Sequence, residues 1–270
     1  MTPATGLEWR SLGTLRYLSG GEGEPLLLLH GLSGSVGNWV ELLPDLAARY
    51  RVLAPDLPGH GYSGRLPRGA STADFAAAAA AVLDHEGHRR ALVAGHSFGG
   101  LVALRLAQAR PDLVGGLLLV SPAGISSATR AARLAVVASA RVRPGRLVAP
   151  FRFRFARRGW YRRALFRPWF VSDALSLTPR AAHGLLAAQP LHADTLVAGR
   201  AMLADDPRLD LPALDCRVLV LWGARDPQLS LEDAFQYARR LRAKLRLIAD
   251  CGHLAIVERP HAVLDALADL

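Results

Sequence analysis

The chain has 270 residues, of which 51% are hydrophobic and 21% charged, and its formal net charge is +10. This length and composition allow a large buried core and exclude a disordered chain. No apolar run approaches the ~18 residues of a membrane span, and the first ten residues lack the apolar stretch of a signal peptide, so we expect a cytoplasmic globular protein.

Short apolar runs alternate with longer helical patterns along the chain. The N-terminal stretch LEWRSLGTLRYLSGG alternates around a central Ser-Leu-Gly and predicts a hairpin at a sheet edge. Continuous apolar runs, typical of strands buried on both faces, are Pro25–His30, Arg51–Asp56, Arg90–Ala94, Leu117–Val120, Arg217–Trp222 and Leu245–Ile248. Helices are expected over Trp39–Ala48, Ser71–His85 and Phe98–Ala109. The alternation predicts an α/β fold with a mostly parallel, doubly wound sheet of about eight strands.

This regular alternation stops at Pro122. From Ala123 to Pro207 the sequence is rich in alanine, arginine and proline and contains no convincing buried strand. We expect a helical cap over residues 123–207, inserted into a core formed by residues 1–122 and 208–270. The charge is concentrated there, because no acidic residue lies between Asp112 and Asp173 while twelve arginines lie from Arg130 to Arg167.

The two cysteines are not expected to form a disulfide. Cys216 precedes one predicted strand and Cys251 follows another. If these strands are parallel, the two thiols lie at opposite ends of the sheet, roughly 20 Å apart, which is beyond disulfide reach. Free thiols favour a reducing compartment.

One serine stands in a pattern that carries chemistry. Gly95-His96-Ser97-Phe98-Gly99 fits G-x-S-x-G and lies between a predicted strand and a predicted helix. Small residues on both sides allow a tight turn that exposes the serine oxygen above the carboxyl edge of the sheet. Ser97 is therefore the candidate nucleophile, with a tight packing turn as the alternative.

A serine nucleophile needs a base, which in turn needs an orienting acid. Asp226 follows the run Arg217–Trp222, and His253 follows the run Leu245–Ile248. Both are expected at the carboxyl edge, where open α/β sheets bind ligands. After the first long run, His30-Gly31-Leu32 provides a backbone N–H at Leu32 that can join the N–H of Phe98 in an oxyanion hole.

Together, LLLLHGLSGSVGNW, RVLAPDLPGHGYSG, GHSFGG, WGARDP and CGHLAIVERP resemble the α/β-hydrolase fold family, in particular esterase-like members with a helical cap. The resemblance covers residues 25–122 and 215–270, and it implies Ser97 as nucleophile, His253 as general base and acid, and Asp226 as its orienter. Related epoxide hydrolases and dehalogenases have aspartate at the nucleophile position, where this chain has Ser97. Leu254 follows His253, where carbon–carbon hydrolases of the family usually have tryptophan.

We expect a hydrolase of carboxylic esters that needs no cofactor and contains no metal site. The same residues also fit a lactonase, thioesterase, C–C hydrolase, acyltransferase or perhydrolase, and a non-catalytic ligand-binding member of the fold is a further alternative. Candidate substrate-pocket residues are Ser33, His96, Phe151, Trp160 and Leu254. His30, His60 and His96 are expected to support turns through backbone hydrogen bonds.

The stretch Phe151–Phe155 alternates phenylalanine and arginine, which places the two residue types on opposite faces if it is extended. This segment fits a lid over an acyl pocket, a surface that associates with acidic or membrane surfaces, or an ordinary solvated face. We expect a small-molecule ester as partner, no nucleic acid, and a monomer or homodimer.

Overall fold

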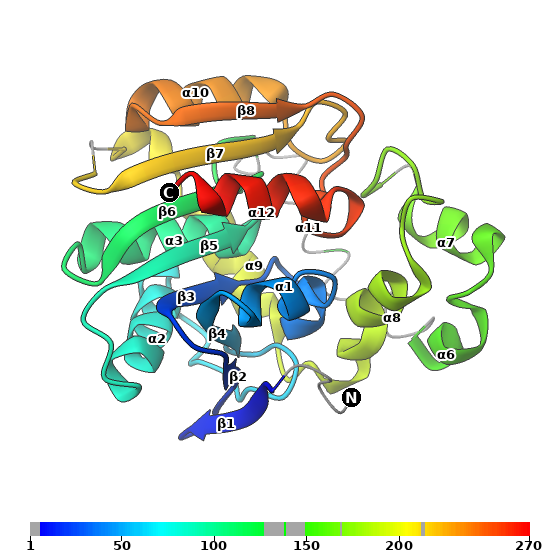
Figure 1. Ribbon diagram of the computed structural model, residues 1–270, viewed down its shortest axis with the longest axis horizontal. Coiled ribbons are helices and arrows are strands. Elements are labelled where there is room, and N and C mark those ends of the chain that lie inside the picture. Colours follow the sequence, from blue (N-terminus) through cyan, green and yellow to red (C-terminus); the bar gives the residue numbers. More distant parts are fainter. Residues whose placement is uncertain (1–5, 127–137, 139–148, 168, 212–213) are drawn as a thin grey trace.

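The computed structural model describes residues 6–126, 138, 149–167, 169–211 and 214–270. Its described residues form an eight-stranded sheet in the order β1-β2-β4-β3-β5-β6-β7-β8 (Figure 1). The strands are β1 Glu8–Leu12, β2 Leu15–Gly20, β3 Glu24–Leu29, β4 Tyr50–Asp56, β5 Ala91–His96, β6 Val114–Val120, β7 Arg217–Gly223 and β8 Lys244–Ile248. The predicted fold class is confirmed.

The first two strands form the predicted hairpin at one edge of the sheet. β1 pairs antiparallel with β2, and β2 pairs antiparallel with β4. All later neighbours are parallel, because each strand returns through a helix that packs on the sheet. The carboxyl ends of β3, β5, β6, β7 and β8 therefore meet along the same edge.

Alternate residues of the central strands enter two separate cores, one on each face of the sheet. Leu27, Val93 and Leu119 pack with α2 (Thr72–His85), α3 (Phe98–Ala109) and α10 (Leu231–Leu241). Leu28 and Ala94 pack on the other face with α1 (Leu43–Ala47), α11 (Ala255–Glu258) and α12 (Pro260–Ala268). Both faces are buried, which explains why the strands are continuously apolar in sequence.

Two of the three predicted helices agree with the structure. The α2 helix begins after Ser71, whose side chain and that of Asp74 form a reciprocal capping box. The expected helix over Trp39–Ala48 is wrong in extent, since a short 3₁₀ turn η1 (Val36–Trp39) precedes α1 (Leu43–Ala47), with Pro44 in its first turn. Proline has no N–H to continue an earlier helix, so α1 begins there.

Helices fill the described part of the region between β6 and β7, as expected for a cap. They are η3 Ala149–Phe151, α6 Arg152–Phe155, α7 Gly159–Phe166, α8 Pro179–Ala187, η4 Gln189–Leu191, α9 Thr195–Ala204 and η5 Pro207–Leu209. In Figure 1, α6, α7 and α8 stand to one side of the sheet, beyond the arrowheads of β7 and β8. Residues 127–137 and 139–148 of the expected cap, with Arg130 and four further arginines, lie outside the described residues.

The cap is continuous with the core in its packing. Side chains of α9 join the core that contains α2 and α3, while Phe166 of α7 and Leu186 of α8 join the core that contains α1 and α12. The expected separation of phenylalanines and arginines over Phe151–Phe155 is wrong, because the stretch is helical. Phe151 and Phe155, four residues apart, lie on the same side with ring centroids 6.1 Å apart.

No described helix is both long and apolar enough to cross a bilayer. Cys216 and Cys251 are both free thiols, as predicted.

Candidate active site

Ser97 occupies a strained turn between β5 and α3. Its backbone has φ 54° and ψ −118°, a region that residues with a Cβ rarely adopt. The turn is held in place because the Ser97 N–H donates to the Val120 carbonyl (3.0 Å) and the Ala123 N–H donates to the Ser97 carbonyl (3.0 Å). The half-buried serine side chain thus stands at the carboxyl edge of the sheet, at the N-terminus of α3.

The glycines around Ser97 are required by close backbone approach. A Cβ on Gly95 would overlap the backbone of Gly99, and a Cβ on Gly99 would overlap the carbonyls of Leu29 and His30 at the end of β3. Any larger residue would push α3 away from the sheet. The G-x-S-x-G pattern is therefore explained by the packing of this turn against two strands.

Asp226 and His253 form a buried hydrogen-bonded pair on neighbouring loops. His253 Nδ1 lies 2.7 Å from Asp226 Oδ2, and the two side chains are 3% and 1% exposed. Because the carboxylate can only accept, Nδ1 carries the proton, which leaves Nε2 as the basic nitrogen. The structure thus brings the predicted acid and the predicted base together in the tautomer that proton transfer needs.

Further donors fix the Asp226 carboxylate. Oδ1 accepts from the N–H groups of Gln228 (2.8 Å) and Leu229 (3.0 Å). Burial alone would raise the pKa of Asp226, but the positive charge and hydrogen bond of His253, together with these two N–H groups, lower it below its ordinary value. Asp226 is therefore an anion that orients the His253 ring.

His96 connects the nucleophile strand to the His253 loop. Its Nε2 lies 2.9 Å from the His253 carbonyl oxygen, and the two rings are 4.9 Å apart. Burial lowers the pKa of His96 to about 3, so the ring is neutral and donates from Nε2. This contact agrees with the predicted turn-supporting role, and it places the His253 imidazole beside the strand end that carries Ser97.

The loop after β3 carries Leu32, one of the two residues whose N–H is predicted to form an oxyanion hole, and Phe98 is the first residue of α3. A Cβ on Gly31 would lie 3.3 Å from the Ser97 Cβ, so this loop passes directly against the serine. Among the described residues, no hydrogen-bond acceptor is paired with the N–H of Leu32 or of Phe98. Two backbone donors near Ser97 can therefore serve an oxygen of a bound ligand.

The buried side chain of His30 stabilises the loop after β3 through two hydrogen bonds. The Leu57 N–H donates to His30 Nε2 (2.9 Å), so Nδ1 carries the proton and donates to the Gly31 carbonyl (2.8 Å). Burial lowers the pKa of His30 to about 3. His60 likewise contacts a turn carbonyl, that of Pro58, at 3.0 Å. Both contacts are of the turn-supporting kind predicted.

Two residues of the cap, Gln189 and His192, form hydrogen bonds to the loop after β3. Ser33 has φ 57°, and its carbonyl accepts from Gln189 Nε2 (2.7 Å) and His192 Nε2 (3.0 Å). His192 Nδ1 accepts from the Gly61 N–H (2.9 Å), which fixes its tautomer. No pattern in the sequence indicates Gln189 or this role of His192, because the contacts join residues more than 130 positions apart.

Glu258, which the sequence analysis also missed, fastens the cap to the His253 loop. Its buried carboxylate accepts from the N–H groups of Gly252 (2.9 Å), Ser172 (3.1 Å) and Asp173 (3.1 Å) and from the Ser172 hydroxyl (2.5 Å). Nearby, the His253 N–H donates to the Phe170 carbonyl (2.8 Å). The cap segment 170–173 and the loop 251–254 are therefore one hydrogen-bonded unit.

The remaining candidate pocket residues divide into two groups. Ser33 lies on the loop after β3, and Leu254 directly follows His253 and is 6% exposed. Phe151 and Trp160 are 53% and 61% exposed, and their ring contacts are with Phe155 and, for Trp160, Tyr161 of the cap. Their assignment to a substrate pocket stays a prediction.

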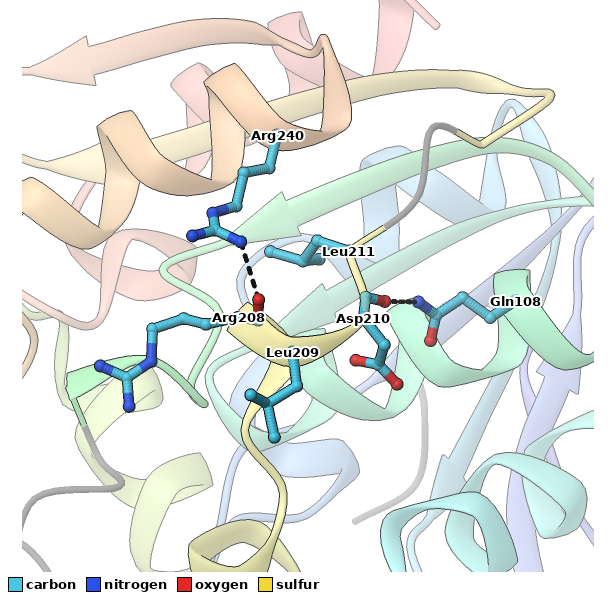
Figure 2. A pocket seen from close by; sticks show the side chains of 6 residues that line it. All are labelled: Gln108, Arg208, Leu209, Asp210, Leu211 and Arg240. Atoms are coloured by element: carbon cyan, nitrogen blue, oxygen red, sulfur yellow. Dashed lines mark hydrogen bonds between the residues drawn. The ribbon is translucent and has the colours of Figure 1, made fainter.

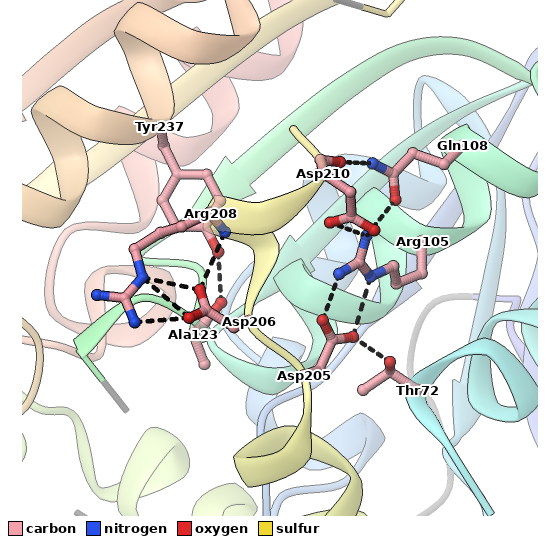
Figure 3. Close-up of polar contacts among 9 residues, drawn as sticks. All are labelled: Thr72, Arg105, Gln108, Ala123, Asp205, Asp206, Arg208, Asp210 and Tyr237. Carbon is pink, nitrogen blue, oxygen red and sulfur yellow. Dashed lines mark hydrogen bonds and ion pairs between the residues drawn. The ribbon is translucent and has the colours of Figure 1, made fainter. Parts of the chain in front are cut away.

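Two open hollows of about 500 Å³ each lie away from Ser97, near the C-terminal half of α3. Figure 2 shows the first, where Leu209 and Leu211 lie between Arg240 and Gln108. Figure 3 shows the polar network beside the second, in which Arg105 pairs with Asp205 and Asp210. These carboxylates already have partners, so the network secures the chain segment between α9 and β7.

Comparison with known proteins agrees with this fold. A family model for the alpha/beta hydrolase fold matches residues 24–260. The chain belongs to the α/β-hydrolase fold family. In this family context, the strained serine and the Asp226–His253 pair are the candidate catalytic groups of an α/β-hydrolase.

Among curated relatives, this α/β-hydrolase is 32% identical over 246 residues to the dihydrolipoyllysine-residue acetyltransferase component of the acetoin cleaving system of Cupriavidus necator. That match covers 91% of this chain but 63% of the relative. The chain is 35% identical over 124 residues to (E)-2-((N-methylformamido)methylene)succinate hydrolase of Acinetobacter baylyi, covering 46% of each protein. A solved thermophilic esterase from Thermogutta terrifontis matches with a TM-score of 0.75 and 26% identity, covering 94% of this chain and 92% of that structure.

Proposed function

We propose that the protein is a serine hydrolase that cleaves carboxylic esters through an acyl-enzyme intermediate. The observation that carries the proposal is the combination of Ser97 on a strained turn with His253 held by Asp226 in the tautomer that leaves Nε2 basic. The similarity to a solved esterase supports the same reaction class.

In the first half-reaction, His253 Nε2 accepts the hydroxyl proton of Ser97 as its oxygen attacks the substrate carbonyl. The negative charge that develops on the carbonyl oxygen is stabilised by the N–H groups of Leu32 and Phe98. The protonated His253, stabilised by Asp226, then gives its proton to the leaving alkoxide, which departs as the alcohol. A water molecule repeats these steps on the acyl-enzyme, releasing the carboxylic acid and restoring Ser97.

The same acyl-enzyme would also form from lactones and thioesters, and it could transfer its acyl group to acceptors other than water. The similarity to an acetyltransferase component and to a hydrolase is compatible with these alternatives. Separate experiments must therefore test whether Ser97 is the nucleophile and which class of acyl substrate the protein cleaves.

The first test is labelling with a fluorophosphonate probe, read by mass spectrometry of the modified peptide. We expect the wild type to be labelled on Ser97 and the Ser97→Ala variant to remain unlabelled with an unchanged circular dichroism spectrum. Folded wild-type protein that is not labelled would contradict the serine-hydrolase proposal and favour a ligand-binding role.

The second test is turnover of aryl esters of increasing acyl length, compared with matched lactones and thioesters. Ester hydrolysis that is lost in Ser97→Ala supports the proposal. Labelling of Ser97 without ester turnover, but with turnover of a thioester or with acyl transfer to an added alcohol, would replace it by the corresponding alternative.

A further inference from the structure

Five arginines on and beside α6 and α7 form no ion pair with any carboxylate of the described residues. Every Asp and Glu of the chain lies among the described residues, yet no ion pair there involves Arg154, Arg157, Arg158, Arg163 or Arg167. All five are exposed. Described arginines that do pair with carboxylates all lie outside α6 and α7 and include Arg10, Arg51, Arg105, Arg110, Arg208, Arg225 and Arg246.

The outer side of α7 combines these charges with an aromatic side chain. Trp160 and Arg163 are exposed and three residues apart, so they share one face of the helix, and the exposed Arg167 follows at its C-cap. The opposite face buries Tyr161 and Phe166 in the core that contains α1 and α12. The helix is therefore held from behind and presents a cationic, aromatic stripe to solvent.

Further large apolar side chains are exposed in the segments before and after α7. Trp169 (66% exposed) and Phe170 (37%) follow the helix, and Leu175 (45%) reaches back toward its first residue, within 3.0 Å of the position a Cβ on Gly159 would take. Phe151 (53%) precedes it, in ring contact with Phe155. We call the exposed side chains Phe151, Arg154, Trp160, Arg163, Arg167, Trp169, Phe170 and Leu175 the α7 surface.

We propose that the α7 surface docks the protein onto an anionic phospholipid membrane. Exposed tryptophan and phenylalanine prefer the headgroup boundary, where an amphipathic element lies with its rings inserted and its arginines against lipid phosphates. Each arginine near such a surface contributes about 1 kcal/mol, and among the described residues no carboxylate forms an ion pair with these guanidinium groups. An isolated polyanion in solution would use the arginines but leave Trp160 and Trp169 in water.

The α7 surface is also connected to the candidate active site. The Trp169 carbonyl accepts from Gln228 Nε2 (3.0 Å), on the loop of Asp226, and the Phe170 carbonyl accepts from the His253 N–H. Docking through Trp169 and Phe170 would therefore place the membrane at the rim of this site. An ester that partitions into the bilayer would be presented to the protein at high local concentration.

The test is flotation of the full-length protein with vesicles of phosphatidylcholine, with and without phosphatidylglycerol. We expect binding to the phosphatidylglycerol vesicles that weakens as salt is added. The Arg163→Glu/Arg167→Glu variant should bind about 30-fold or more weakly, since two contacts of about 1 kcal/mol are lost. The matched control Arg68→Glu/Arg239→Glu changes the net charge equally at exposed core positions and should bind within about 3-fold of wild type.

Tryptophan quenching by brominated lipids tests the docking geometry. We expect quenching in the wild type and its loss in Trp160→Phe/Trp169→Phe. Of the three remaining tryptophans, Trp39 and Trp222 are buried in the core, and the exposed Trp9 lies on β1 at the hairpin edge of the sheet, away from the α7 surface (Figure 1). Hydrolysis of a water-soluble aryl ester by Arg163→Glu/Arg167→Glu should stay within about 2-fold of wild type, which separates docking from catalysis and confirms folding.

Three results would overturn the proposal. They are equal binding to both kinds of vesicle, equal loss of binding in the matched control, and binding to heparin or RNA without binding to phosphatidylglycerol vesicles. The last result would assign the arginines to a soluble polyanion.

Discussion

Replacing Glu258 with glutamine tests how the cap is joined to the loop of His253. The substitution keeps the size and shape of the side chain but leaves one acceptor oxygen and introduces an NH₂ group. The present carboxylate receives three N–H groups and one hydroxyl, shared between its two oxygens. If the amide oxygen takes the place of Oε1, the new NH₂ group faces the Gly252 N–H, which is a donor against a donor.

The cost follows from these contacts. A buried donor left without an acceptor costs about 1–3 kcal/mol, and hydrogen bonds to a charged acceptor lose about half their strength when that acceptor becomes neutral. Together these losses predict that the free energy of unfolding falls by about 3 kcal/mol in Glu258→Gln. We also expect kcat for an aryl ester to fall more than KM changes, because the His253 loop loses its tie to the segment 170–173.

Urea unfolding followed by circular dichroism measures the first effect, and steady-state kinetics measures the second. Glu22→Gln is the matched control, since Glu22 is exposed and its change should stay within about 0.5 kcal/mol. If Glu258→Gln were as stable as this control and its kcat were unchanged, the buried carboxylate would not be what fastens the cap to the His253 loop.

Three further predictions concern single buried positions. Gly99→Ala places a Cβ against the backbone carbonyls at the end of β3 and should cost about 3 kcal/mol or more; urea unfolding with a loss below about 1 kcal/mol would count against the packing explanation. Burial lowers the pKa of His30 and of His96 from 6.5 to about 3. Between pH 6.5 and pH 3 the unfolded chain therefore binds protons at these histidines while the native state does not, and the free energy of unfolding falls as the pH falls. Each histidine should lower it by about 2 kcal/mol between pH 7 and pH 5. Unfolding at both pH values measures this, and a His96→Gln variant with the same pH dependence as wild type would contradict it. Burial raises the pKa of Cys251 to about 12, so iodoacetamide should modify Cys251 more slowly than the half-buried Cys216 in native protein; peptide mapping that shows equal rates would refute this.

The sequence was most informative where one local rule decides the structure. The strands were found because burial on both faces makes each of them continuously apolar, and the turn at Ser97 was found because two close backbone contacts allow only glycine beside it. Asp226 and His253 were placed at one edge because parallel strands end together. These features depend on residues that are neighbours in the chain.

The parts that were missed depend on contacts between distant segments. Gln189 and His192 reach Ser33 from more than 150 positions away, and Glu258 meets Ser172 over 86 positions. No spacing in the sequence indicates such pairs. The alternation over Phe151–Phe155 misled for a different reason, since a period of two separates faces only in an extended chain and this segment is helical.

The backbone conformation of Ser97 lowers the stability of the fold, although the proposed reaction requires a serine at this position. A non-glycine residue at φ 54° and ψ −118° costs on the order of 1–3 kcal/mol, which the surrounding hydrogen bonds and packing must offset for as long as the protein is folded. Glycine would relieve that strain, and it would also remove the oxygen proposed as the nucleophile. At this position the residue that favours stability therefore differs from the residue that the proposed reaction requires.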